Sequence, residues 1–133
     1  MKSNAALLLI FLCLSCNLGT SAFKEGAFLY QTHCASCHGS HAEGLGQWYP
    51  PLTDTSYLNS RRSEIPAWIR YGINRDSGSR FHGRINQTDM PENSFLKPAD
   101  ISNILNYLND TYWKQKPFDL EEVETSLKWA RNL

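Results

Sequence analysis

Apolar residues recur at helical spacing along this chain, and no stretch alternates between apolar and polar residues for long enough to predict a strand. The clearest helix is predicted over residues 98–109. Four aliphatic side chains share one of its faces: Ile101, Ile104, Leu105 and Leu108. The pattern therefore predicts an all-α domain.

Three shorter helices are expected around this one. Residues 24–33 run directly into a pair of cysteines, and residues 63–71 carry an apolar stripe that includes Ile69. The last helix is predicted to begin at Asp119, because its spacing from Glu122 is typical of a capping box.

Residues 1–22 have the pattern of an export signal, with Lys2 ahead of an apolar run that is too short to span a bilayer. Two endings are compatible with it. Leu14-Ser15-Cys16 resembles a lipoprotein signal, which would leave a lipidated Cys16 as a membrane tether, and this ending is favoured. The alternative is ordinary cleavage after Ala22. Either ending exports the chain to the periplasm or to the outer face of a membrane.

Composition limits the remaining chain to one domain, residues 23–133, of which the last part is a helical extension. The whole sequence has 133 residues, with 13 basic and 13 acidic side chains. This balance gives no basic footprint for a nucleic acid, and it predicts weak electrostatic steering toward any partner.

The chemistry of the chain is concentrated in Cys34-Ala35-Ser36-Cys37-His38. Two cysteines separated by two residues and followed at once by histidine form the attachment motif of c-type haem. Each thiol can add to one vinyl group of the porphyrin, and the histidine is then placed under the macrocycle as an iron ligand. The predicted cofactor is one haem c, bound through Cys34 and Cys37, with His38 as a metal ligand. Export agrees with this, because c-type haem is attached outside the cytoplasm.

Two other uses of paired cysteines are less compatible with the sequence. A structural zinc site would need a second pair of ligands, and no second CxxC or HxxxH follows. A thioredoxin-like redox pair would lie at a strand-to-helix turn of a βαβ unit, and that pattern is absent from the sequence.

A histidine that binds iron through one ring nitrogen needs an acceptor for the N–H of the other. The segment Tyr49-Pro50-Pro51-Leu52 follows the motif after a glycine-containing loop. We expect the carbonyl of Pro50 to accept the N–H of His38. A plain polyproline-type turn explains the two prolines equally well.

Residues 74–93 predict a long polar surface loop, which is uncommon in a small domain unless it has a function. The loop contains Met90, the only methionine besides the initiator. A thioether is a soft ligand that suits haem iron, so Met90 is predicted as the second axial ligand. His82 is the serious alternative, because His33 and His41 lie too close to the motif to cross to its other side.

Several features follow one another along the chain in a fixed order. They are Gly26 with Tyr30, the cysteine motif, residues 49–52, residues 68–72, Met90 with Pro91, and the helix that contains Ile104, Tyr107 and Leu108. In this order they resemble class I monohaem cytochrome c. The resemblance covers residues 23–110, and residues 113–128 look like an extension found in some bacterial members.

The resemblance implies the cytochrome c fold, in which the first and last main helices cross near Gly26. It also implies that Pro50 orients His38 and that Leu52 and Ile69 pack on the haem. The predicted cofactor-binding set is therefore Cys34, Cys37, His38, Met90, Pro50, Leu52 and Ile69, with no catalytic residue.

The function predicted from these observations is one-electron transfer, not enzyme catalysis. The protein would be a monomer that meets respiratory or dehydrogenase partners by small, transient contacts, or the cytochrome subunit of a larger oxidoreductase. The alternative is a haem enzyme or a gas or peroxide sensor in which Met90 dissociates from the iron. The sequence offers no distal acid–base pair to support that alternative.

Overall fold

The computed structural model describes residues 23–73, 80–81, 84–85 and 89–131. The predicted export segment, residues 1–22, lies outside the described residues, and so does the rival ligand His82. None of the described helices is both long enough and apolar enough to cross a bilayer.

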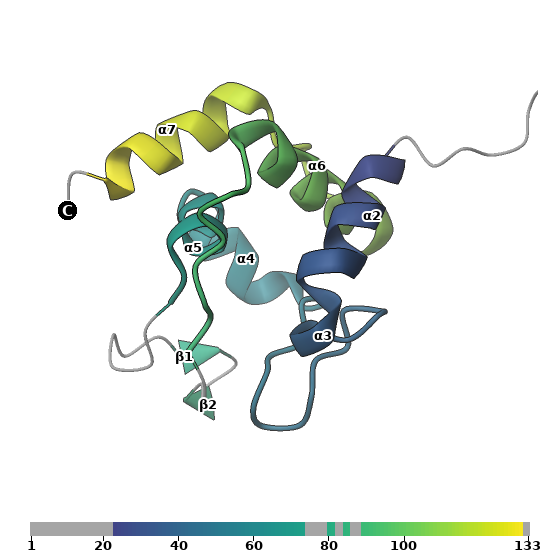
Figure 1. Ribbon diagram of the computed structural model, residues 1–133. Helices are drawn as coiled ribbons and strands as arrows, with labels where there is room; N and C mark the ends of the chain where they lie inside the picture. Colours follow the sequence, from purple (N-terminus) through teal and green to yellow (C-terminus); the bar gives the residue numbers. More distant parts are fainter. Residues whose placement is uncertain (1–22, 74–79, 82–83, 86–88, 132–133) are drawn as a thin grey trace, which may run out of the picture.

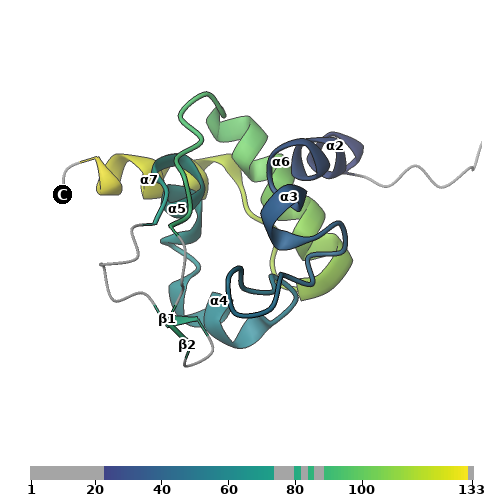
Figure 2. The ribbon, with the colours of Figure 1, turned by 60° about the horizontal axis from the view of Figure 1, so that its bottom comes forward.

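The described chain is mainly helical, and Figures 1 and 2 show how its helices are arranged. Its helices are α2 (Lys24–His33), α3 (Ala35–His38), α4 (Thr55–Arg61), α5 (Ile65–Tyr71), α6 (Pro98–Leu108), the π-helical turn η3 (Asn109–Trp113) and α7 (Leu120–Ala130). The antiparallel strands β1 (Arg80–Phe81) and β2 (Arg84–Ile85) pair over two residues each. The all-α prediction is confirmed, although the sequence pattern missed this small ribbon, which is too short to show alternation.

The predicted helices agree with the structure in place but not in every boundary. The first matches α2, whereas the helix predicted over residues 63–71 begins only at Ile65. The clearest helix ends at Leu108 and continues as η3, and α4 was not predicted. Asp119 caps α7 as expected, because its Oδ1 accepts the backbone N–H of Glu122 at 2.7 Å.

The centre of the fold is the crossing of α2 and α6, which lie side by side in Figures 1 and 2. A Cβ added at Gly26 would lie 2.0 Å from the carbonyl oxygen of Asn103, so only glycine permits this close approach. The rings of Tyr30 and Tyr107 pack beside it, with centroids 5.6 Å apart. The helix crossing that the resemblance implied is present.

The C-terminal helix α7 covers α5, as Figure 1 shows. Val123 is fully buried and Leu127 nearly so, whereas Leu120 at the start of the helix is half exposed. The extension is therefore packed into the domain through one apolar face.

Candidate haem site

The helices α2 and α3 meet at Cys34 and present the cysteine motif to the pocket. The backbone N–H of Cys34 still bonds to the carbonyl of Tyr30, at 2.8 Å, so the chain turns into α3 without leaving helical geometry. Cys34 and Cys37 are free thiols, and both line the same pocket as His38. The motif therefore places two thiols and one imidazole on a single wall.

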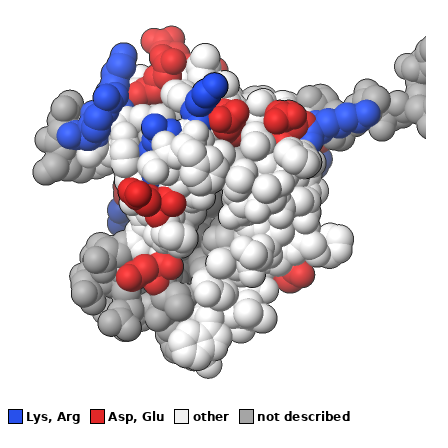
Figure 3. Space-filling model, in the orientation of Figure 1, with Lys and Arg blue, Asp and Glu red and all other residues white. Residues whose placement is uncertain are grey.

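The pocket is large and mainly apolar. The space between protein atoms there is about 1030 Å³, a figure that includes open solvent at its mouth. Its apolar walls include Leu52, Trp68, Ile69, Ile104, Leu108 and Trp113. Figure 3 shows a hollow between the side that carries α5 and the side that carries α2 and α3, bordered mostly by uncharged atoms.

His38 is nearly buried, with 9% of its surface exposed, and its Nδ1 lies 3.0 Å from the carbonyl oxygen of Pro50. A carbonyl can only accept, so the proton belongs on Nδ1 and Nε2 keeps a lone pair. Burial lowers the pKa of His38, and the Pro50 carbonyl opposes this to a smaller extent. The imidazole is therefore set up as a neutral metal ligand, and the expected contact with Pro50 is present.

Further hydrogen bonds hold the loop around His38. The Tyr30 hydroxyl donates to the carbonyl of Gly39 at 2.7 Å, and the N–H of Gly44 donates to the carbonyl of His38 at 2.7 Å. The N–H of Leu52 donates to the carbonyl of Ala42 at 2.8 Å. These bonds fix the loop at its start, middle and end.

The Cys34 thiol lacks the lowered pKa of a catalytic dithiol. Burial and, to a smaller extent, the neighbouring Cys37 raise the pKa of the Cys34 thiol to about 11. Catalytic dithiols work through a lowered pKa, so this site does not resemble a thioredoxin-like centre. Within the described residues, no group of three or more His, Cys, Asp or Glu side chains could hold a metal ion.

Met90 lines the same pocket and is held through its backbone. It forms an isolated antiparallel bridge with Ile73, with both N–H···O distances at 2.9 Å. Beside it, the Asn93 side chain donates to the carbonyl of Ile69 at 3.1 Å. The bridge brings the end of the predicted loop against the end of α5 and places Met90 at the pocket wall.

All seven predicted cofactor-binding residues line this one pocket. Their roles toward a haem stay predictions, but two free thiols, a neutral buried imidazole and a thioether around an apolar space fit that group. Of the other rival ligands, His33 lines the pocket with its ring packed 4.9 Å from the Phe95 ring, and His41 does not line it.

Trp113 is a pocket residue that the sequence analysis missed. Its indole N–H donates to the carbonyl of Leu52 at 2.6 Å. A regular helix would continue the stripe from Leu108 to Tyr112, whereas the π-helical turn adds a residue and brings Trp113 into phase. The aromatic pair Tyr112-Trp113 past the end of the stripe was the only available signal.

Most of the chain is similar to known proteins. The family profile described as cytochrome c matches residues 23–111. The chain is 30% identical over 89 residues to the cbb3-type cytochrome c oxidase subunit FixP of Sinorhizobium medicae (strain WSM419), covering 65% of this chain and 29% of that protein. It is 31% identical over 103 residues to the dehydrogenase subunit of a quinone alcohol dehydrogenase from Gluconacetobacter polyoxogenes, covering 68% and 11%. The chain thus spans less than a third of the length of these relatives.

Proposed function

The chain belongs to the cytochrome c family. We propose that it is a one-electron carrier with a single haem attached at Cys34 and Cys37. The observation that carries the proposal is the shared pocket, where both thiols, His38 and Met90 line one apolar space. Membership of the family implies a covalently bound haem c; the number of haems and the residues that hold it are our assignment.

His38 and Met90 are proposed as the two axial ligands. Haem iron supplies one reversible electron between its ferrous and ferric states, and histidine–methionine ligation raises its reduction potential. With His38 and Met90 as ligands, no substrate would need to bind the metal. The Pro50 carbonyl holds the proton of His38 on Nδ1 and so leaves the lone pair of Nε2 available for a metal.

The apolar walls of the pocket would limit the contact of a bound haem with water. Leu52, Ile69 and Leu108 present hydrocarbon, which limits solvent reorganisation when the charge of the centre changes. A low-dielectric shell also favours the less charged ferrous state. The side chains therefore serve orientation, ligation and dehydration, and no acid–base step is assigned to them.

The electron partners are proposed to be redox proteins of the cell envelope. Relatives of this chain include a subunit of a cytochrome c oxidase and the dehydrogenase subunit of a quinone alcohol dehydrogenase. We propose that this chain meets such a partner by transient contact, or serves as the cytochrome subunit of such a complex. Residues 1–22 are proposed to export it, with Cys16 as a lipid tether.

Mass spectrometry of the purified mature chain tests the proposal. The expected mass is that of the polypeptide plus one haem, and the polypeptide part distinguishes a lipidated Cys16 from cleavage after Ala22. Replacing Cys34 and Cys37 by Ser should abolish the haem stain on a denaturing gel, whereas Ser36→Ala in the same motif should retain it. Covalent pigment in the double Cys→Ser variant would refute the attachment.

A further inference from the structure

One residue beyond the end of the family match, at 111, also contributes to the pocket. Trp113 lines it with only 5% of its surface exposed. The segment around Trp113 comes from neither the cysteine motif nor the Met90 side. The contacts of this segment indicate how it supports the pocket wall around Leu52.

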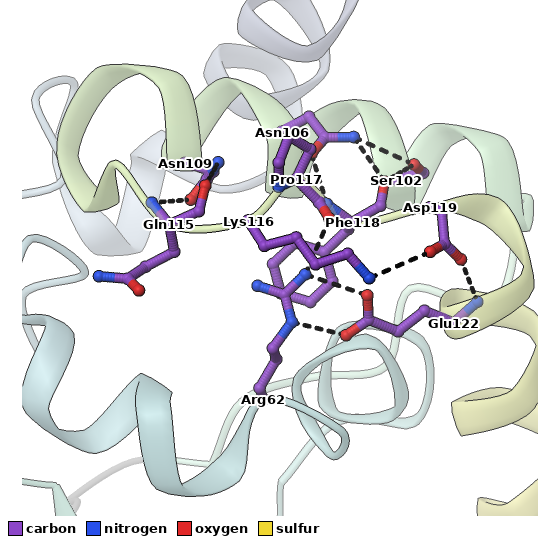
Figure 4. Close-up of polar contacts among 10 residues, drawn as sticks. All are labelled: Arg62, Ser102, Asn106, Asn109, Gln115, Lys116, Pro117, Phe118, Asp119 and Glu122. Atoms are coloured by element: carbon purple, nitrogen blue, oxygen red, sulfur yellow. Dashed lines mark hydrogen bonds and ion pairs between the residues drawn. The ribbon is translucent and has the colours of Figure 1, made fainter.

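The path from Trp113 to α7 is fixed by side-chain amides of α6 and η3 (Figure 4). Asn109 bonds both polar groups of the Gln115 backbone, donating to its carbonyl at 2.8 Å and accepting its N–H at 2.9 Å. Asn106 does the same to the buried backbone of Phe118, at 2.8 Å in both directions. Each pair of hydrogen bonds gives a non-helical residue the partners that its backbone N–H and carbonyl would otherwise lack.

Arg62 fastens this segment from the other side, as Figure 4 shows. Its guanidinium forms a bidentate pair with Glu122, at 2.6 and 3.0 Å, and donates to the carbonyl of Pro117 at 3.0 Å. The same group lies 3.6 Å above the centre of the Phe118 ring. The planar guanidinium forms the ion pair, donates the hydrogen bond and stacks on the ring at the same time, which fixes its orientation. A lysine ammonium could not make all three contacts.

Phe118 connects this segment to Trp113, because the two rings pack edge to face with centroids 6.3 Å apart. The indole N–H of Trp113 bonds the carbonyl of Leu52, while the N–H of Leu52 bonds Ala42. Leu52 is therefore fixed through both its N–H and its carbonyl, two residues after the Pro50 carbonyl that orients His38.

We propose that Trp113 is a positioning residue that keeps the reduction potential of this centre high, by holding the segment from Pro50 to Leu52 closed against the pocket. The inference rests on the proposed haem site and deepens it. Without the indole N–H, the carbonyl of Leu52, a residue that lines the pocket, loses its donor, and a water molecule would take the donor's place beside the pocket. Water stabilises the more highly charged ferric state, so the potential falls. A loosened segment also holds the His38 N–H less firmly.

The test compares Trp113→Phe, which keeps an aromatic ring but lacks the N–H, with Trp129→Phe. Trp129 is a half-exposed indole on α7 that does not line the haem pocket, so it controls for loss of a tryptophan in the same extension. Spectroelectrochemical titration of the holoprotein gives the midpoint potential. Proton exchange of the His38 ring N–H, followed by NMR in the diamagnetic ferrous state, reports the Pro50 contact. Arg62→Met, which removes the fastening from a distance, is measured in the same way in case Trp113→Phe does not fold.

A lower potential and several-fold faster exchange of the His38 N–H in Trp113→Phe, with the Trp129→Phe values equal to wild type, supports the inference. Arg62→Met is expected to shift both quantities in the same direction by less. An unchanged or raised potential in Trp113→Phe, or an equal shift in Trp129→Phe, overturns it. If Trp113→Phe does not fold, the Arg62→Met values decide in the same way. Wild-type chain without covalent haem would instead refute the proposed function itself, so the two failures are distinguishable.

Discussion

The wall of the pocket that carries His38 is held by several hydrogen bonds within its loop and by one from the distant Trp113, whereas Met90 itself is held by a backbone bridge. On the histidine side, Tyr30 bonds Gly39, nine positions away, and Trp113 bonds Leu52, 61 positions away. On the methionine side, Met90 forms the bridge to Ile73, and Asn93 bonds the end of α5.

This difference predicts two kinds of response to mutation. On the histidine side several bonds hold the same loop, so losing one should reduce stability without changing the ligands. On the methionine side a small local change should alter the ligation while the fold persists. Each variant below is therefore measured for both the visible spectrum and the free energy of unfolding.

The largest effect is expected from Met90→Ala, which removes the proposed thioether ligand. The haem should stay covalently bound, but the thioether-to-ferric charge-transfer band should vanish and the ferrous form should bind CO rapidly. The reduction potential should fall. Met90→His should close the iron again at a lower potential than wild type, because histidine–methionine ligation is the pair that raises it. An intact charge-transfer band in Met90→Ala would assign the ligand to another residue.

A smaller effect on the same side is expected from Gly72→Ala. Gly72 has φ +78°, and an added Cβ would lie 2.4 Å from the carbonyl oxygen of Met90. The substitution should push the bridge apart and weaken the charge-transfer band, with partial CO binding. Gly46→Ala is the matched control, because it has φ +55° but open space around its Cβ. Both variants are destabilised by their positive φ, and Gly72→Ala the more so, because a ψ of −179° at this φ is adopted almost only by glycine. Only a difference in the spectrum therefore tests the contact with Met90.

On the histidine side, Tyr30→Phe should lower stability and leave the spectrum unchanged. Tyr30 is fully buried, and without its hydroxyl the carbonyl of Gly39 loses its donor. We expect the free energy of unfolding to fall by about 1–3 kcal/mol. Urea unfolding of the holoprotein measures this. Tyr71→Phe is the control, because its bond to Leu127 is longer, at 3.3 Å, and the residue is 41% exposed. A lost charge-transfer band in Tyr30→Phe would contradict the proposed difference between the two sides.

The smallest effect is expected far from both sides, at Asp119. The N–H of Glu122 holds the pKa of this carboxyl below its usual 3.8, and Lys116 adds to the shift. The charged form thus contributes stability above about pH 3.8, and this contribution is lost as the pH falls through the native pKa. The difference in unfolding free energy between wild type and Asp119→Asn should therefore shrink in acid. A difference that is constant from pH 7 to pH 3 would contradict this.

The helices and the cysteine side of the site could be predicted because local patterns specify them. The stripe of residues 98–109 predicts α6, and the spacing of the motif places Cys34, Cys37 and His38 together. The contact of His38 with Pro50 was predictable because a ligating imidazole needs a rigid acceptor nearby.

The remaining features depend on tertiary contacts that no local pattern contains. The helix α4 has no clear apolar stripe in the sequence, and the strands β1 and β2 are too short to alternate. Trp113 joins the pocket only because a π-helical turn changes the phase of α6. The Arg62–Glu122 pair links residues 60 positions apart, which spacing rules cannot anticipate.

The ferric visible spectrum of the wild-type holoprotein at neutral pH tests the central claim most directly, namely that His38 and Met90 fill both axial positions. We predict a low-spin spectrum that includes the thioether-to-ferric charge-transfer band. A high-spin ferric spectrum would contradict it, since it would mean that one axial position is open and that the protein is built to bind a ligand at its iron.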